Sequence, residues 1–166
     1  MATLAKLARL PARDVLLLLR TGVLLVLVAV GLRLLPLRGL QALLRRRIRS
    51  RAAADPRDRR APARLAWAVE TAGRYRLGTC LSRALALQFL LSRHGLSSRL
   101  WLGVQRVDTR GGARARRLLR AHAWLEHDGR AVIGGPAPDG YTPLGCFQAG
   151  EVNSVRDVTG IRGSAA

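Results

Sequence analysis

One cysteine and one histidine in this chain have the surroundings that nucleophilic catalysis requires. Cys80 follows the short segment Leu77-Gly78-Thr79 and begins a helical stretch over residues 80–91. A thiol at a helix N-terminus faces unpaired backbone N–H groups and the positive end of the helix dipole, and both favour the nucleophilic thiolate. His122 lies about forty residues later in a stretch that reads as a strand. A histidine from a separate element is the base that such a thiol needs, so the pair predicts cysteine-based acyl chemistry.

The segments around this pair predict an α+β fold. The expected elements are helices over 64–73 and 80–94 and strands over 99–107, 118–127 and 130–133. Gly95 suits the left-handed position at a helix C-terminus, and Asp128-Gly129 is a two-residue hairpin signal. Helices followed by an antiparallel meander predict helices packed on one face of a sheet. This layout puts Cys80 at a helix tip and His122 on a neighbouring strand.

Three regions of the chain differ in character. Residues 1–50 read as apolar and basic N-terminal helices, 51–63 as a polar linker with two prolines, and 64–166 as the domain that carries both candidate residues. Within that domain, residues 134–166 are rich in Gly, Pro and Asp and have little periodicity. We therefore predict covering loops for this last stretch.

The apolar part of the N-terminal region is marginal for a membrane span. Residues 15–32 are apolar apart from an interruption around Arg20, and a basic run follows at 45–47. A helix that crosses lipid needs about 20 apolar residues, and no convincing signal-peptide cleavage site follows. The sequence leaves open two alternatives, a buried helical hairpin and a segment associated with a membrane.

The charge of the chain is strongly basic. The 166 residues include 29 Lys+Arg and 10 Asp+Glu, a formal charge of +19, and 49% of them are hydrophobic. Such an excess suits nucleic acid, an anionic membrane or an acidic peptide, although a genome rich in G and C produces the same composition. No helix-turn-helix, zinc finger or RNA-binding aromatic motif accompanies the charge, so we predict no nucleic-acid partner.

Cysteine and histidine usage predicts neither a metal nor another cofactor. The two cysteines, Cys80 and Cys146, form no CxxC pair, and the three histidines lack zinc-ligand spacing relative to them. The sequence contains neither a P-loop nor a glycine-rich turn after a strand, so we predict no nucleotide site. One reactive thiol without a stapled disulfide scaffold favours a reducing, cytoplasmic setting.

The motifs around Cys80 and His122 resemble a known family. In order, they are Thr79-Cys80-Leu81-Ser82-Arg83-Ala84-Leu85-Ala86-Leu87, Leu90-Leu91 with His94-Gly95, Leu102-Gly103-Val104, Ala121-His122-Ala123-Trp124-Leu125-Glu126 and Asp128-Gly129-Arg130. Together they resemble the stand-alone leader peptidases of lasso-peptide biosynthesis. These are transglutaminase-like cysteine proteases, similar to the C-terminal part of the microcin-processing B protein. The set covers about residues 64–134, and the leucine-rich and arginine-rich stretches before it also resemble the family.

The resemblance implies a papain/transglutaminase-like core that removes the leader from a ribosomally made precursor peptide. It implies Cys80 as the nucleophile, His122 as the general base, and the backbone N–H of Cys80 as an oxyanion donor. Trp124 would pack beside the histidine. The implied partners are the precursor peptide, a small leader-recognition protein and an ATP-dependent lasso cyclase.

The chain departs from the family at the residue that orients the histidine. The family usually has an acid about a dozen positions beyond it, where this chain has Ile133-Gly134-Gly135. Asp139 is the nearest acid downstream and is our candidate for the third catalytic residue. Glu126 lies along the same strand face and is less suited in distance and direction. Because this acid is missing, an alternative is that the protein is an inactive relative of these peptidases.

Two other functions stay open at this point. One is a non-catalytic basic scaffold protein bound to an anionic membrane or nucleic acid, and the other is a transglutaminase that transfers the acyl group to an amine. Arg83, one turn after Cys80, has two alternatives as well: it helps to hold the thiolate, or it is a solvated surface charge.

Overall fold

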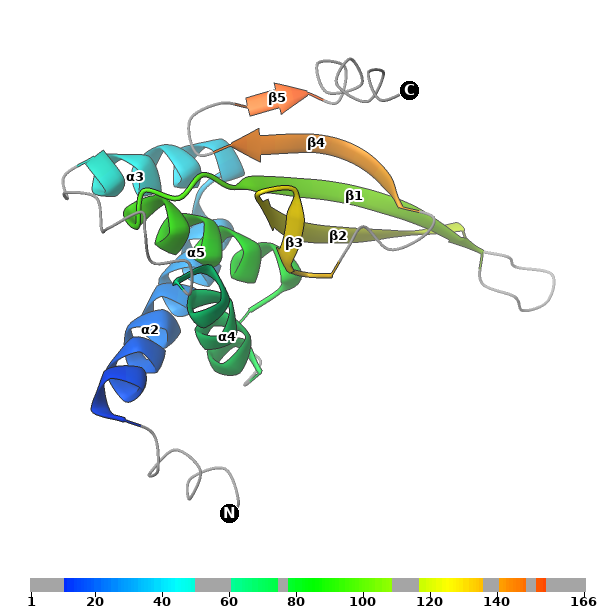
Figure 1. Cartoon of the computed structure of the whole chain (residues 1–166). Coiled ribbons are helices and arrows are strands. Elements are labelled where there is room, and N and C mark those ends of the chain that lie inside the picture. The colour runs from blue at the N-terminus through cyan, green and yellow to red at the C-terminus, as the bar shows by residue number, and fades with distance from the viewer. Residues whose placement is uncertain are drawn as a thin grey trace, which may run out of the picture.

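The computed structural model describes residues 11–49, 61–74, 78–108, 117–135, 141–148 and 152–154. The helices in these ranges are α2 (Ala12–Leu34), α3 (Leu37–Arg49), α4 (Ala61–Gly73) and α5 (Cys80–Arg93), and the strands are β1 (Arg99–Asp108), β2 (Arg117–His127), β3 (Arg130–Ile133), β4 (Thr142–Gln148) and β5 (Val152–Ser154). The helices gather at one end and one face of an antiparallel sheet (Figure 1). The predicted α+β class, with the Cys80 helix packed on the sheet, is confirmed.

Helix α5 begins at Cys80 because Thr79 caps it. Thr79 has an extended backbone (φ −74°, ψ 169°), and its hydroxyl accepts the Ser82 N–H at 3.3 Å, while the Ser82 hydroxyl donates to the Thr79 carbonyl at 3.0 Å. The helix ends at Arg93 with His94 as its C-cap, and Gly95 takes the predicted left-handed conformation (φ 69°). The Leu96 N–H then reaches back to the Leu91 carbonyl at 3.0 Å, which closes the last turn.

The described part of the sheet has the strand order β3-β2-β1-β4-β5. The long β1–β2 pairing runs from Arg99 opposite Glu126 to Asp108 opposite Arg117. Asp128 and Gly129 both have positive φ (50° and 73°), as a two-residue hairpin turn with right-handed twist requires, so the predicted turn is confirmed. The returning strand β3 is short and pairs with β2 only over Leu125–His127.

The prediction of covering loops after Gly134 is wrong for part of that stretch. Residues 142–148 form β4, which pairs with the far edge of β1, and residues 152–154 form β5. Pro143 and Gly145 obscured the strand pattern in the sequence, because both residues are depleted in strands. In the structure Gly145 pairs with Leu102 and Pro143 pairs with Gly103. The register of the β1–β4 pairing shifts between these two pairs.

The two faces of the sheet bury different clusters of side chains. Ala123 and Leu125 of β2 join Leu100 of β1 in the core that lies under the helices, together with α5 side chains such as Leu85. On the opposite face, Trp101, Trp124 and Cys146 form a second cluster. This alternation follows from the strand geometry, since successive side chains point to opposite faces.

The N-terminal helices pack against the helices that lie on the sheet. Thr21, Leu25 and Val28 of α2 are buried where this helix contacts α4 and α5. Helix α4 begins at Ala61, inside the stretch that the sequence predicts as a linker over 51–63, and residues 50–60 lie outside the described ranges. The apolar helix α2 thus shares a core with the helix that begins at Cys80.

Candidate active site

Cys80 is exposed and unbonded at the start of α5. Its thiol forms no disulfide, and no hydrogen bond to it is found within the described ranges. The Thr79 hydroxyl accepts a hydrogen bond from the Ser82 N–H, and the Thr79 carbonyl accepts one from the Arg83 N–H at 3.1 Å. The N–H groups of Cys80 and Leu81 are left without an intrahelical acceptor, because the first N–H groups of a helix have none. The thiol therefore lies beside N–H groups that are free to bind an anion.

His122, in contrast, is held on several sides. Its ring stacks on Trp124 with 6.2 Å between the ring centroids and an angle of 18° between the planes, as the resemblance implied. The Tyr141 ring lies tilted against it at 5.6 Å between centroids. One ring nitrogen, Nε2, is hydrogen-bonded to the carbonyl oxygen of Gly134 at 2.8 Å. The orientation of the imidazole is thus set by two aromatic rings and one main-chain oxygen.

His122 lies where one edge of β2 is left open. Strand β3 ends at Ile133, opposite Leu125, so β3 does not pair with β2 at the level of His122. Directly after β3 the chain turns through Gly134 and Gly135, both in the left-handed region with φ 84° and 74°. This turn brings the Gly134 carbonyl to the imidazole.

The elements that carry Cys80 and His122 pack against each other, but the two side chains are not bonded. Helix α5 contacts β2, and the start of α5 lies at the sheet (Figure 1). The His122 side chain shares a face with Trp124, whereas its neighbour Ala123 faces the helices. Within the described residues no hydrogen bond joins the thiol to the imidazole. Catalytic hydrogen bonds are often long before substrate binds and tighten only in the complex.

The predicted third residue, Asp139, lies outside the described residues. Glu126 is engaged elsewhere, because its two carboxylate oxygens accept the indole N–H groups of Trp101 at 2.8 Å and Trp124 at 3.2 Å. The two indoles are themselves stacked, with 6.1 Å between centroids. The group that does contact His122 is the Gly134 carbonyl, which the sequence analysis did not identify. The paired glycines at the usual acidic position were the available signal.

Arg83 is not the solvated surface charge that was one of its two alternatives. Its guanidinium donates from Nη2 to the Gly73 carbonyl at 2.8 Å, and the side chain is half-buried. A Cβ placed on Gly73 would lie 2.7 Å from Arg83 Nε, so the guanidinium lies directly on the last residue of α4. Arg83 therefore joins the end of α4 to the first turn of α5.

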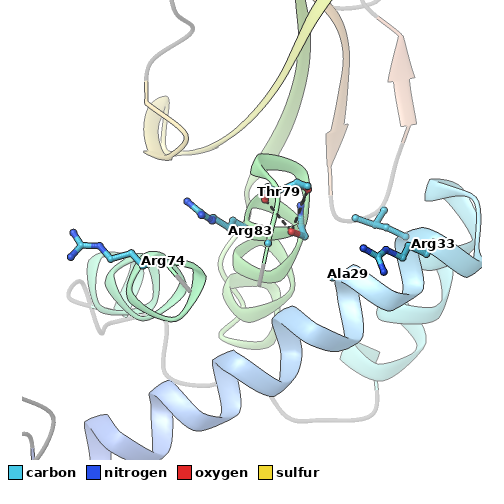
Figure 2. A pocket seen from close by; sticks show the side chains of 8 residues that line it. Ala29, Arg33, Arg74, Thr79 and Arg83 are labelled. Atoms are coloured by element: carbon cyan, nitrogen blue, oxygen red, sulfur yellow. Dashed lines mark hydrogen bonds between the residues drawn. The ribbon is translucent and has the colours of Figure 1, made fainter. Parts of the chain in front are cut away.

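A basic cleft of about 510 Å³ lies beside the start of α5 (Figure 2). Its lining comes from α2, from the end of α4 and from the cap and first turn of α5: Ala29, Leu32, Arg33, Arg74, Gly78, Thr79, Ser82 and Arg83. Three of these residues are arginines and none is acidic. The cleft therefore favours a negatively charged group next to the residue that precedes Cys80.

Cys146 is buried, whereas Cys80 is exposed. It is 3% exposed and packs against Trp101 and Trp124. Burial raises the pKa of its thiol, and Glu126 adds to this effect while Arg99 opposes it. A neutral, covered thiol is unreactive. In the part of the chain that the structure describes, no three His, Cys, Asp or Glu side chains gather into a metal-binding set.

A cysteine at the tip of a helix that packs on an antiparallel sheet, with a histidine on one strand of that sheet, is consistent with a fold of the cysteine-peptidase type. The chain matches the Transglutaminase-like superfamily over residues 24–146, from within α2 to β4. The match covers most of the chain, and the protein belongs to this superfamily. No curated protein and no solved structure matches the chain significantly.

Proposed function

We propose that the protein is a cysteine peptidase that removes the leader from a ribosomally made lasso precursor peptide. The observation that carries the proposal is the free, exposed Cys80 at the capped N-terminus of α5 in a transglutaminase-like chain. His122 is the general base, supported by its position on the strand against which α5 packs. Leader removal itself rests on the resemblance of the motifs to the lasso leader peptidases.

The proposed reaction has two steps. The Cys80 sulfur bonds to the scissile carbonyl carbon while its proton passes to His122, and the protonated imidazole gives that proton to the leaving amine as the C–N bond breaks. Water then attacks the thioester, delivers its hydroxyl to the acyl carbon and returns a proton to the thiol through His122. The N–H groups of Cys80 and Leu81 stabilise the oxyanion in both steps.

The basic cleft beside Cys80 is the proposed binding site for an acidic part of the precursor. Arg33, Arg74 and Arg83 line it without a carboxylate among the other lining residues, so a Glu or Asp side chain of the peptide would find complementary charge. A small leader-recognition protein would deliver the leader, and the lasso cyclase would take the released core peptide. Both partners are proposed from the family resemblance.

Mass spectrometry of a reconstituted reaction tests the peptidase. The purified protein is incubated with the precursor peptide and the leader-recognition protein, and Cys80→Ala and Cys146→Ala serve as matched thiol variants. A leader fragment is expected with wild type and Cys146→Ala and is expected to be absent with Cys80→Ala. Cleavage by Cys80→Ala, or no cleavage by folded, partner-bound wild type, would contradict the proposal. An adduct with an added amine in place of hydrolysis would indicate acyl transfer.

A second proposal concerns where the protein works. Helix α2 is long and apolar enough to cross a membrane, and only a small share of it is buried. One face of α2 is covered by α4 and α5, and the opposite face exposes aliphatic side chains: Leu16, Leu19, Val23, Val26, Leu27, Val30 and Leu34. A helix that packs on a globular core along its length does not also span a bilayer.

We therefore propose that the exposed face of α2 rests in the surface of an anionic membrane on its cytoplasmic side. Exposed arginines border this face at Arg13, Arg20 and Arg33, and the net charge of +19 favours anionic lipid. The face contains only Leu and Val, whereas protein interfaces are enriched in aromatic anchors. Lipid is the occupant that this composition fits.

Vesicle flotation tests the membrane proposal. We expect wild type to float with vesicles of anionic phosphatidylglycerol and to stay in the soluble fraction with zwitterionic phosphatidylcholine. Leu19→Gln combined with Leu27→Gln should abolish flotation. The matched control is Leu119→Gln with Leu144→Gln, two leucines exposed elsewhere (69% and 58%), which should float like wild type. Equal flotation of both double variants, or a stable dimer that only the α2 variant disrupts, would overturn it.

A further inference from the structure

We propose that the main-chain carbonyl of Gly134 orients His122, in the place where related proteases carry an acidic side chain. The inference rests on the proposed function, because it assigns a positioning group to the base of that reaction. It also changes the meaning of the missing acid, since the site contains an orienting group that does not depend on a side chain.

The hydrogen bond itself determines which ring nitrogen can act as the base. A carbonyl oxygen only accepts, so His122 Nε2 must carry the hydrogen in the 2.8 Å bond to Gly134. In the neutral imidazole the other nitrogen, Nδ1, then holds a lone pair. No hydrogen bond to Nδ1 is found in the described part of the chain. Nδ1 is therefore the nitrogen that accepts the thiol proton, and the carbonyl selects this tautomer.

The backbone at Gly134 is incompatible with an acid at the same position. Its φ of 84° lies in the left-handed region, and a Cβ there would lie 2.7 Å from the Ala123 carbonyl oxygen and 3.0 Å from Trp124 Cα. A side chain of any kind would push the chain away from β2, and with it the carbonyl that meets His122. The glycine is thus the residue that allows the main chain to approach closely enough to take over the acid's position.

A carbonyl and a carboxylate hold a histidine differently. Both fix the ring and its tautomer, but the carbonyl is neutral and stabilises an imidazolium only through its dipole. Here the ring additionally packs against Trp124 and Tyr141. Glu126, further along the same strand, has both carboxylate oxygens committed to the two indoles. Orientation rather than charge is therefore what Gly134 supplies.

Gly134→Ala tests this role, and Gly135→Ala is its matched control. Gly135 has a similar left-handed φ of 74°, but a Cβ on it meets nothing within 4 Å. Both variants add the same methyl group to the same kind of backbone, and only Gly134→Ala collides with β2. The readouts are the side-chain nitrogen NMR signals of His122, which report the tautomer, and kcat and KM for precursor cleavage.

In wild type we expect the His122 signals of a ring protonated at Nε2. Gly134→Ala should lose this pattern and lower kcat by about 10²-fold with KM changed less than about twofold, because misplacing a catalytic group by about 1 Å has an effect of that order. Gly135→Ala should keep both the tautomer and kcat. Asp139→Asn should also keep both, because the carbonyl already occupies Nε2.

Several outcomes would overturn the inference. One is a wild-type ring protonated at Nδ1, and another is equal behaviour of Gly134→Ala and Gly135→Ala. A third is a loss of kcat and of the tautomer in Asp139→Asn, which would assign the role to that acid. If Gly134→Ala does not fold, the wild-type and Asp139→Asn spectra still decide. If wild type cleaves no peptide, the proposed function fails while the tautomer measurement continues to test the carbonyl.

Discussion

Cys80 and His122 are held in opposite ways. The thiol is exposed at a helix tip, with no hydrogen bond among the described residues, while the imidazole is packed against two aromatic rings and bonded to a main-chain oxygen. In the proposed reaction the nucleophile has to meet a substrate that arrives from solvent, whereas the base has to present one nitrogen in one direction. The difference teaches that the strand side of this site is pre-organised and that the helix side is left accessible.

The largest expected effect separates the two thiols. Cys80→Ala should lower precursor cleavage by about 10⁴-fold or more, as the loss of a nucleophile does in other hydrolases, whereas Cys146→Ala should leave kcat within about twofold. Initial rates from mass spectrometry of the precursor check both. A comparable loss in Cys146→Ala, with its fold intact by circular dichroism, would contradict the assignment of the exposed thiol.

The next largest effect is expected on stability, at the strand that carries His122, when Glu126 is replaced. Glu126→Ala leaves two indole N–H groups in the Trp101–Trp124 cluster without their acceptor, and we expect a loss of about 1–3 kcal/mol in the free energy of unfolding, measured by urea denaturation. Glu126→Gln is the control, since its amide oxygen can still accept one of these bonds. A loss no larger in Ala than in Gln would show that the indoles do not need the acceptor.

A smaller effect is expected at the helix side. Thr79→Ala removes the hydroxyl that accepts the Ser82 N–H, and the loss of such a cap lowers stability by about 1 kcal/mol. Thr79→Ser keeps the hydroxyl and should be close to wild type in thermal unfolding. Equal melting temperatures for all three proteins would mean that the start of α5 does not depend on this cap.

The smallest effect concerns the pH dependence of stability. Burial raises the pKa of Cys146 in the folded protein above its ordinary value of 9.0, so its contribution to stability is complete below pH 9 and is lost as the pH rises through the folded-state pKa. Urea unfolding between pH 8 and about 11 should show a steeper fall in wild type than in Cys146→Ala. Parallel curves for the two proteins would contradict this.

Local patterns explain what the sequence predicted correctly. Thr79 and Gly95 lie at the two ends of α5 and stop it by short-range hydrogen bonds and backbone conformation. Asp128-Gly129 forms a turn because of its own backbone preferences. Each of these features can therefore be predicted from a few neighbouring residues. Strand β4 was not predicted because it contains Pro143 and Gly145 and is stabilised by pairing with β1, about forty residues earlier in the chain. Non-local pairing leaves little trace in a local pattern.

The candidate site also has one part that the sequence predicts from local patterns and one part that depends on non-local contacts. The types and context of Cys80 and His122 marked them as candidates, since only a few side chains perform this chemistry. The partner of His122 could not be found by searching for an acidic side chain, because the structure bonds the imidazole to a main-chain carbonyl that every residue possesses. What distinguishes position 134 is the conformation and closeness of its backbone, which only the folded sheet reveals.

The contact between His122 and Gly134 also has a genetic consequence. A carboxylate can be erased by many single codon changes that keep the fold, but a carbonyl remains whatever residue is encoded. Position 134 is then sensitive to the presence of any Cβ and indifferent to the charge or polarity of the replacement. A library of all substitutions there should show uniformly low activity for alanine, aspartate and lysine alike, a signature opposite to that of a side-chain triad member.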